Sequence, residues 1–264
     1  MKNITENKIE KLIKKILPQA GEILRKKFRK TGVKYTKSHA LDVVTEADIA
    51  VNRMLLNTIR KNFPDHGIVS EETGKHQNNS EYIWVIDPLD GTLNFSRGIP
   101  FFVSMLAVFR NKKLIMSAIY DPIYDELAFA RHGFGAMING KRIKASRCKD
   151  VRTSIGTVSS VFQEEQKKLF NLLVKEAEKL KAMATGSEGY NAMITARGAG
   201  DWYVNYNPRI WDIAPGVLLL KEAGHKVTNI YGKSWQFGDR GIISAEKNLH
   251  KKLVGLVRKS LDSP

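Results

Sequence analysis

Apolar residues recur three or four positions apart in the first part of the chain, a spacing typical of amphipathic helices. Residues 9–24 follow this spacing and predict a long helix, in which Pro18 is the candidate position for a kink. Thr45 and Asp48 form a Thr-x-x-Asp capping pattern before a second periodic run. The helix that starts there is expected to end near Phe63, because Pro64 follows.

From residue 82 onward the pattern changes to short apolar runs separated by turn residues, which predicts strands. The runs 103–109 and 114–120 flank a polar turn and predict a β-hairpin. The polar segment 73–80, just before this region, is expected to be a mobile loop.

A second half begins near Thr153, with strands and helices that follow one another in no strict alternation. We expect strands at 154–160, 201–205 and 241–245, and helices at 164–180, 187–197, 211–223 and 246–258. A layered α+β or α/β architecture fits this order better than a barrel does. No internal repeat or low-complexity linker interrupts the chain.

Length and composition set limits on the kind of protein. The 264 residues allow one large domain or two closely packed ones, and 42% apolar with 27% charged residues excludes disorder as the dominant state. The longest apolar stretch, 98–109, is too short to span a membrane, and the N-terminus lacks a signal-peptide core. The single cysteine, Cys148, has no internal disulfide partner, so a reducing cytoplasm is expected.

The charge balance is strongly basic, with a formal net charge of +16. Such an excess favours anionic partners, namely phosphorylated metabolites, nucleic acid or acidic lipid surfaces. The basic residues are spread along the chain and form no long tail, so a solvated lysine-rich surface is the simpler explanation.

The segment Trp-Val-Ile-Asp-Pro-Leu-Asp-Gly-Thr, residues 84–92, carries the most specific chemical signal. An apolar strand leads into it, and Pro88 with Gly91 favours a tight turn that brings Asp87 and Asp90 together. Two close carboxylates repel each other unless a cation lies between them, and hard oxygen ligands suit Mg²⁺. The N–H groups of Gly91 and Thr92 could open a short helix and bind an anion beside the metal. An acidic turn that merely ends the strand is the alternative.

Three further acidic features have simple explanations when each is taken alone. Glu71 and Glu72 could form a solvated pair, Asp212 could stabilise the dipole of a helix first turn, and Asp48 could serve only its capping box. The chain has no P-loop, no G-x-S-x-G and no His-x-x-x-His, so nucleotide-loop, serine-hydrolase and zinc chemistry are poorly supported. The six histidines are expected at the surface or in packing.

Taken together, these features resemble the inositol monophosphatase family of the Mg²⁺-dependent, lithium-sensitive phosphatase superfamily. The resemblance runs from about Lys37 to Gly224. It rests on four segments in order, which are DVVTEAD at 42–48, Glu-Glu at 71–72, WVIDPLDGTLNF at 84–95 and WDIAPG at 211–216 followed by Glu-Ala-Gly at 222–224. Pro215 and His225 depart from the usual small residues of the family and put local helix packing in doubt.

The resemblance implies a layered α/β/α/β/α sandwich, one unit over 1–264 that pairs as a homodimer. Its N-terminal half, about 1–150, would carry the metal and phosphate site, and its C-terminal half, about 151–264, would face substrate and supply Asp212. Two to three Mg²⁺ ions are implied. Glu71, Asp87 and the Leu89 carbonyl would hold the first, Asp87, Asp90 and Asp212 the second, and a weaker third would lie near Glu71 with Asp48 reaching it through water.

The implied activity is phosphomonoester hydrolysis by metal-activated water, oriented and deprotonated by Glu71 and the Thr92 hydroxyl. The residues expected to bind substrate are Asp90, Gly91, Thr92, Ser187, Asn205 and Asp212. Asn205 stands where family enzymes that act on inositol phosphates often carry a glutamate, and Arg209 lies nearby. Inositol monophosphate or a similar sugar phosphate is favoured as substrate, while fructose 1,6-bisphosphate and 3′-phosphoadenosine nucleotides stay open. Binding to RNA or to a transcription complex is the alternative of another class and is not favoured, because the basic residues lack interleaved aromatics.

Overall fold

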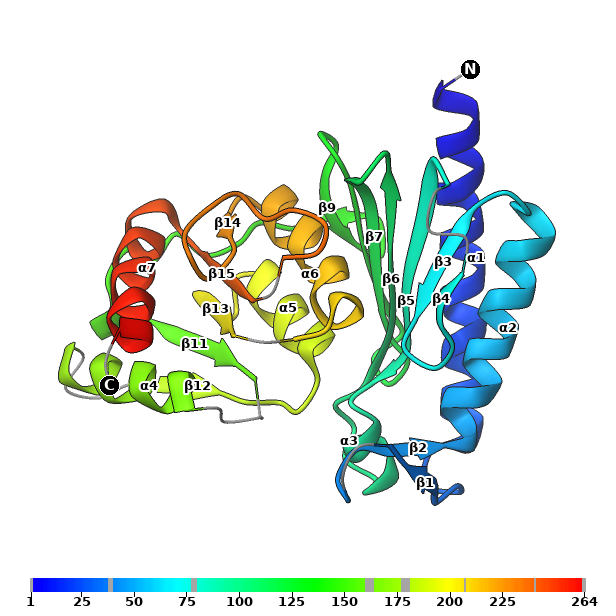
Figure 1. Cartoon of the computed structure of the whole chain (residues 1–264), viewed down its shortest axis with the longest axis horizontal. Helices are drawn as coiled ribbons and strands as arrows, with labels where there is room; N and C mark the ends of the chain where they lie inside the picture. The colour runs from blue at the N-terminus through cyan, green and yellow to red at the C-terminus, as the bar shows by residue number, and fades with distance from the viewer. Residues whose placement is uncertain are drawn as a thin grey trace.

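The computed structural model describes residues 2–37, 40–76, 80–159, 164–176, 181–206, 208–239 and 241–262. Two sheets alternate with three pairs of helices in layers (Figure 1). Helices α1 and α2 cover the outer face of the first sheet, α5 and α6 lie between the sheets, and α4 and α7 cover the second sheet. This arrangement confirms the layered α+β fold that the sequence predicts.

The N-terminal layer consists of α1, Lys2–Lys27, and α2, Glu46–Asn62. Their apolar faces are buried together under the first sheet, as the helical spacing predicts. Between them, β1 and β2 (Val33–Thr36 and Val43–Thr45) form a small antiparallel sheet. The capping box at Thr45 and Asp48 is present, and α2 ends at Phe63 as expected.

The first sheet has eight strands in the order β10-β9-β8-β7-β6-β5-β3-β4. Its strands are β3 Gly67–Ser70, β4 Gly74–His76, β5 Tyr82–Asp90, β6 Val103–Arg110, β7 Lys113–Asp121, β8 Glu126–Arg131, β9 Gly135–Ile138 and β10 Lys141–Arg142. The antiparallel β6–β7 pair confirms the predicted hairpin. Strands β3 and β5 are parallel neighbours, so the residues that follow them lie at the same edge of the sheet.

The segment 73–80 is not the simple loop that its polar composition predicts. Residues 74–76 form β4, which pairs with β3 and makes the edge of the sheet. A short polar strand of this kind has no apolar alternation to reveal it, because only its backbone takes part in the sheet. Residues 77–79 lie outside the described part of the chain.

The second sheet has five strands in the order β12-β11-β13-β15-β14. Its elements and their neighbours are η1 Val151–Thr153, β11 Ile155–Val158, α4 Glu164–Glu176, β12 Lys181–Met183, α5 Glu188–Ala196, β13 Trp202–Asn205, α6 Ile210–Ala223, β14 Lys226–Thr228, β15 Ile242–Ala245 and α7 Lys247–Asp262. The predicted helices and strands of this half are all present, although residue 160 of an expected strand and residues 177–180 of an expected helix lie outside the described residues.

Helix α6 is buried on most of its surface because it lies between the two sheets. Its side chains share one apolar core with strands of the first sheet, so residues from both halves of the chain pack together. Pro215 is accommodated inside this helix, and Gly224 ends it with a φ of 109°. His225 is buried beyond that cap. In the described part of the chain, every helix is too short or too polar to cross a lipid bilayer.

Candidate active site

Most of the predicted site residues come from six elements whose ends meet at one edge of the first sheet. Glu71 follows β3, Asp87 and Asp90 end β5, and Thr92 opens the short helix α3, Thr92–Ser96. The N-terminal ends of α2, α5 and α6 bring Asp48, Ser187 and Asp212 to the same region. The parallel register of β3 and β5 continues past the strands, since the Glu71 N–H donates to the Ile86 carbonyl at 3.2 Å.

A β-bulge brings Asp87 and Asp90 onto one side of the sheet. Residues three apart in a regular strand point to opposite faces. Here Asp87 pairs with Met105 and Asp90 with Val103, so β5 advances three residues where β6 advances two. The extra residue reverses the alternation and lets both carboxylates face the same way. The sequence predicts a tight turn at this point, and the structure has a bulged strand instead.

Asp90 anchors the N-terminal end of α5. Its Oδ1 accepts from the Glu188 N–H at 3.1 Å, and its Oδ2 accepts from the Gly189 N–H at 2.6 Å and from the Ser187 hydroxyl. A Cβ on Gly189 would lie 2.6 Å from a methyl of Val103, so only glycine lets the helix approach this closely. Ser187, which we expected at the substrate, therefore contacts Asp90.

Asp87 and Asp90 are buried, Asp212 is partly buried, and neighbouring carboxylates raise the pKa of each. Burial raises the pKa of Asp87 well above its usual value, and the charges of Glu71, Asp90 and Asp212 raise it further. Burial and the Glu71 charge likewise raise the pKa of Asp212. The pKa of Asp90 rises to about 7, mainly through burial, although its hydrogen bonds to α5 oppose the rise. Negative charge is thus concentrated here without enough neighbouring cations to balance it.

Asp48 serves both its helix cap and the site. Its Oδ2 accepts from the Thr45 N–H at 2.7 Å, while its Oδ1 lies 2.9 Å from the Thr92 hydroxyl oxygen. That hydroxyl also lies 2.8 Å from the Leu89 carbonyl oxygen, and with one hydrogen it donates to one acceptor at a time. Burial raises the pKa of Asp48 to about 6. The capping explanation and the site explanation therefore both hold for this residue.

Lys37 is a member of the site to which sequence reasoning gives no role. Its ammonium lies 2.8 Å from a carboxylate oxygen of Glu71 and 2.8 Å from one of Glu72. The two glutamates hold the pKa of Lys37 above its usual value despite partial burial. Nothing in the sequence distinguishes Lys37 from the other basic residues, which number 43 with the arginines included. Its contact depends on β1 and β2, whose pairing the apolar pattern does not reveal.

A second group of polar side chains lies beside Asp90, where β13 approaches α5. The Tyr203 hydroxyl donates to the Glu188 carboxylate, and the Asn205 amide nitrogen lies 3.5 Å from the Tyr203 oxygen. The Glu188 charge raises the pKa of Asp90, Asp212 and Tyr203, which places it within the same electrostatic site. The sequence predicts Asn205 at the substrate but attaches no particular role to Glu188. A glutamate at a helix N-terminus is too common to signal one.

The donor set fits a hard divalent cation. Carboxylate and carbonyl oxygens are the ligands that Mg²⁺ prefers, and buried carboxylates that repel one another are stabilised by a cation between them. Among the described residues, no three His, Cys, Asp or Glu side chains are already arranged as the ligands of one ion. Lys37 engages Glu71 and α5 engages Asp90, so part of the donor set is held by protein contacts.

Comparison with known proteins gives consistent matches over nearly the whole chain. A family model described as the inositol monophosphatase family matches residues 6–262. A fructose-1,6-bisphosphatase/inositol-1-monophosphatase of Thermotoga maritima is 31% identical over 248 residues, covering 94% of this chain and 95% of that protein. The Nus factor SuhB of Escherichia coli K12 is 31% identical over 254 residues, covering 92% and 93%.

Solved structures show the same architecture. An IMPase of Thermotoga maritima superposes with a TM-score of 0.88 at 30% identity, covering 97% of this chain and 98% of that one. An IMPase/NADP phosphatase, solved as a complex with Mg²⁺ and phosphate, superposes with a TM-score of 0.85 at 25% identity, covering 96% and 95%.

Proposed function

Because the chain belongs to the inositol monophosphatase family and is therefore a phosphoric monoester hydrolase, we propose that it uses Mg²⁺ to hydrolyse inositol monophosphate or a similar sugar monophosphate. One observation carries the proposal. Asp87 and Asp90 lie buried on β5, Asp212 lies partly buried at the start of α6, and the charges of Asp90 and Asp212 both raise the pKa of Asp87. Such an arrangement is costly in a protein that never binds a cation there.

The ligand assignments extend the same proposal. Glu71, Asp87 and the Leu89 carbonyl would hold a first Mg²⁺, and Asp87, Asp90 and Asp212 a second, with a weaker third ion near Glu71 and Asp48. When bound, Mg²⁺ supplies the charge that acidifies water and stabilises a leaving alkoxide. The structure of a relative with Mg²⁺ and phosphate supports this choice of ion.

The protein's own groups would orient water and move its proton. Glu71 and the Thr92 hydroxyl would face the attacking water. Thr92 can pass a proton towards Asp48, which lies 2.9 Å away and has a pKa of about 6. The Gly91 N–H, at a φ of 87°, would bind phosphate oxygen together with the N–H of Thr92. A Cβ on Gly91 would lie 2.7 Å from the Phe101 carbonyl oxygen, so a side chain would disturb this turn.

Glu188, Tyr203 and Asn205 would select the leaving group. The Glu188 carboxylate can accept hydrogen bonds from sugar hydroxyls, and Tyr203 holds it in place. A fixed negative charge also repels a second phosphate on the substrate, which favours a monophosphate. Two other residues favour substrates with a second phosphate. Asn205 is uncharged, and the exposed Arg209 nearby could bind that phosphate, so fructose 1,6-bisphosphate and 3′-phosphoadenosine nucleotides are the competing substrates.

A phosphate-release assay with three substrates tests this choice. With Mg²⁺ present, we expect a higher kcat/KM for inositol 1-phosphate than for fructose 1,6-bisphosphate or 3′-phosphoadenosine 5′-phosphate. Glu188→Gln should reduce the preference for the monophosphate about tenfold, equivalent to about 1.4 kcal/mol. The exposed and remote Glu164→Gln variant is the matched control. A wild-type preference for either competitor, or an unchanged preference in Glu188→Gln, would contradict the substrate proposal.

We also propose that the protein pairs with a second copy through an apolar patch of Ile99, Phe101, Ile123 and Tyr124. These side chains are each at least 37% exposed. Phe101 lies 5.1 Å from the Tyr190 ring, and Tyr124 is close enough to Tyr190 to raise its pKa, so Tyr190 connects two members of the patch. Light scattering should give the mass of a dimer for the wild type, and Phe101→Glu should shift it towards the monomer.

The alternative of another class is binding to RNA or to a transcription complex. Two observations favour this alternative: several relatives are named Nus factor SuhB, and the net charge of this chain is +16. A salt-dependent gel shift with RNA, compared with Mg²⁺-dependent phosphate release, separates the two functions. The compartment we propose is the cytoplasm, because the single cysteine, Cys148, is free and forms no internal disulfide.

A further inference from the structure

A basic cavity of about 850 Å³ lies away from the candidate active site. Its walls are the segment that follows β10, the C-terminal end of α6, the start of β14 and the start of α7. Helix α6 carries Asp212 at one end and reaches the cavity with Ala223, which at 1.5 Å per residue separates the two by about 16 Å. In Figure 1, β9 and β14 lie in the upper half of the molecule, whereas α3 at the active-site edge lies in the lower half.

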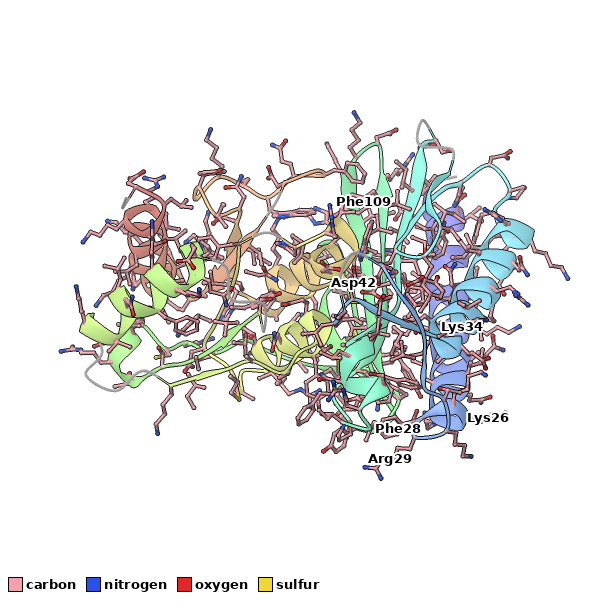
Figure 2. All side chains as sticks on the ribbon, turned by 60° about the horizontal axis from the view of Figure 1, so that its bottom comes forward. Lys26, Phe28, Arg29, Lys34, Asp42 and Phe109 are labelled. Atoms are coloured by element: carbon pink, nitrogen blue, oxygen red, sulfur yellow. The ribbon has the colours of Figure 1, made fainter. Side chains whose placement is uncertain are left out.

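Six basic side chains line this cavity, and we call them the basic pocket: Arg142, Lys144, Arg147, Lys149, Lys226 and Lys247. Basic side chains also project from many other elements, such as Lys26 and Arg29 at the end of α1 in Figure 2. The basic pocket differs from that general surface because its cations surround one concave space.

The two acidic side chains in the cavity wall already have partners. Glu222 accepts from the N–H groups of Gly133 and Gly135 at 2.8 and 2.7 Å. Glu246 accepts from the Asn248 N–H at 2.7 Å. Within the described part of the chain, none of the six pocket cations lies within ion-pair distance of a carboxylate. The pocket therefore keeps a net positive charge, since six cations line it against two carboxylates.

One of the cations lies where a nearby anion would be favourable. The Lys226 charge lowers the pKa of both Lys221 and His250, so its field reaches the surrounding core. An anion in the cavity would relieve this repulsion. The N-terminus of the 16-residue helix α7 already has a carboxylate beside Lys247, because Glu246 accepts from the Asn248 N–H.

The lining also limits the kind of anion. Among the described residues that line it, His225 alone has an aromatic ring, and that ring is buried and bonded to Ser244 and to the Ser146 carbonyl. A nucleobase would find no exposed ring on which to stack. Lysine and arginine side chains recognise phosphate oxygens, and the volume is that of a small-molecule site. We propose that the basic pocket binds a small anion carrying at least two phosphate groups, at a site separate from catalysis.

Binding of inorganic tripolyphosphate, measured by calorimetry with the full chain, tests the proposal. The measurement is made with EDTA and about 0.15 M salt, so that neither bound Mg²⁺ nor long-range attraction contributes. We expect one site per chain. Lys144→Gln/Lys226→Gln/Lys247→Gln should weaken binding at least about tenfold. The control Lys11→Gln/Lys61→Gln/Lys113→Gln removes the same charge from exposed lysines elsewhere and should change the affinity less than about twofold.

Three results would overturn the proposal. The first is that tripolyphosphate does not bind the wild type. The second is that the pocket variant and the control variant lose affinity for tripolyphosphate equally, which would mean that diffuse charge attraction holds the anion. The third is that the wild type binds a short single-stranded RNA but not tripolyphosphate, and that the pocket variant binds this RNA more weakly. That result would make the surface a nucleic-acid contact. Thermal unfolding checks that both triple variants fold, and Lys144→Gln/Lys226→Gln replaces the pocket variant if it does not. Asp212→Asn should bind tripolyphosphate as the wild type does, since the catalytic carboxylates take no part.

Discussion

Asp90 shows how far single residues could be predicted. The sequence places it beside Asp87, and the structure does bring both to one face. Its hydrogen bonds to Ser187, Glu188 and Gly189 could not be predicted, because they join segments nearly 100 residues apart. The same holds for Lys37, whose contact with Glu71 spans 34 positions. A motif identifies the residues of a local turn, whereas partners from distant segments need the fold.

The histidines provide a residue-scale test of the core. Two of them, His225 and His250, are buried as the sequence predicts for packing residues, and the exposed His132 agrees with a surface position. His39 and the side chain of His76 lie outside the described residues. Burial lowers the pKa of His225 to about 4, below the value of about 6.5 for an unfolded chain.

This shift has a definite sign. Between pH 6.5 and 4 the unfolded chain binds more protons at His225, so the free energy of unfolding falls as the pH falls. From pH 7.5 to pH 5 the loss from this residue is about 2 kcal/mol. His225→Gln should lose about that much less stability over the same interval, measured by urea unfolding. Buried carboxylates are common to both proteins and cancel in the comparison. If the free energy of unfolding depends on pH equally in the two proteins, His225 is not held in its neutral form by burial.

At the scale of elements, long periodic segments and apolar strands were predicted well, and short polar strands were not. Helices α1, α2, α6 and α7 carry apolar faces that reveal them. Strands β1, β4 and β10 have two to four residues and mostly polar side chains. They exist because their backbones pair with a neighbour, a tertiary property that no local pattern records.

One of these short strands leads to a prediction about motion. Strand β4 follows Glu71 and Glu72, which Lys37 holds in the structure. Metal ions at Glu71 would compete with Lys37 and draw this segment towards the site. We expect amide hydrogen exchange across residues 71–80 to slow when Mg²⁺ and substrate are both added. Residues 247–262 of α7 serve as an internal control. Equal amide exchange rates across residues 71–80 with and without ligands would show that this segment does not close over the site. That result would not test the metal site.

At the scale of the whole molecule, the order of the layers came from the family resemblance and not from the pattern. Helix α6 packs on the first sheet and also contacts the second, and its core contains residues from both halves. Local periodicity predicts that α6 is apolar but does not say which sheets cover it. The four motif segments were sufficient to identify the fold, since their order along the chain matches that of the family.

Lithium inhibition depends on the assembled site. The second proposed metal position is built from Asp87, Asp90 and Asp212, which come from two different layers. A small monovalent ion there, held with product phosphate, should delay product release. We expect lithium to inhibit uncompetitively with respect to substrate, and excess Mg²⁺ to inhibit as well. Sodium at matched ionic strength controls for the screening of a basic protein's attraction for an anionic substrate. Equal depression of the rate by lithium and sodium would contradict this part of the account.

The central claim is that buried carboxylates hold the Mg²⁺ that drives phosphate release. The most direct measurement is the rate of phosphate release from inositol 1-phosphate across a Mg²⁺ titration, for the wild type and for Asp90→Asn. Asparagine keeps one oxygen that can accept from the N-terminus of α5, so the variant should fold, which its thermal unfolding checks. We predict wild-type activity that requires Mg²⁺ and is abolished by EDTA, and turnover in Asp90→Asn lower by about a hundredfold or more. Hydrolysis that persists in EDTA, or a folded Asp90→Asn variant with wild-type turnover, would contradict the account.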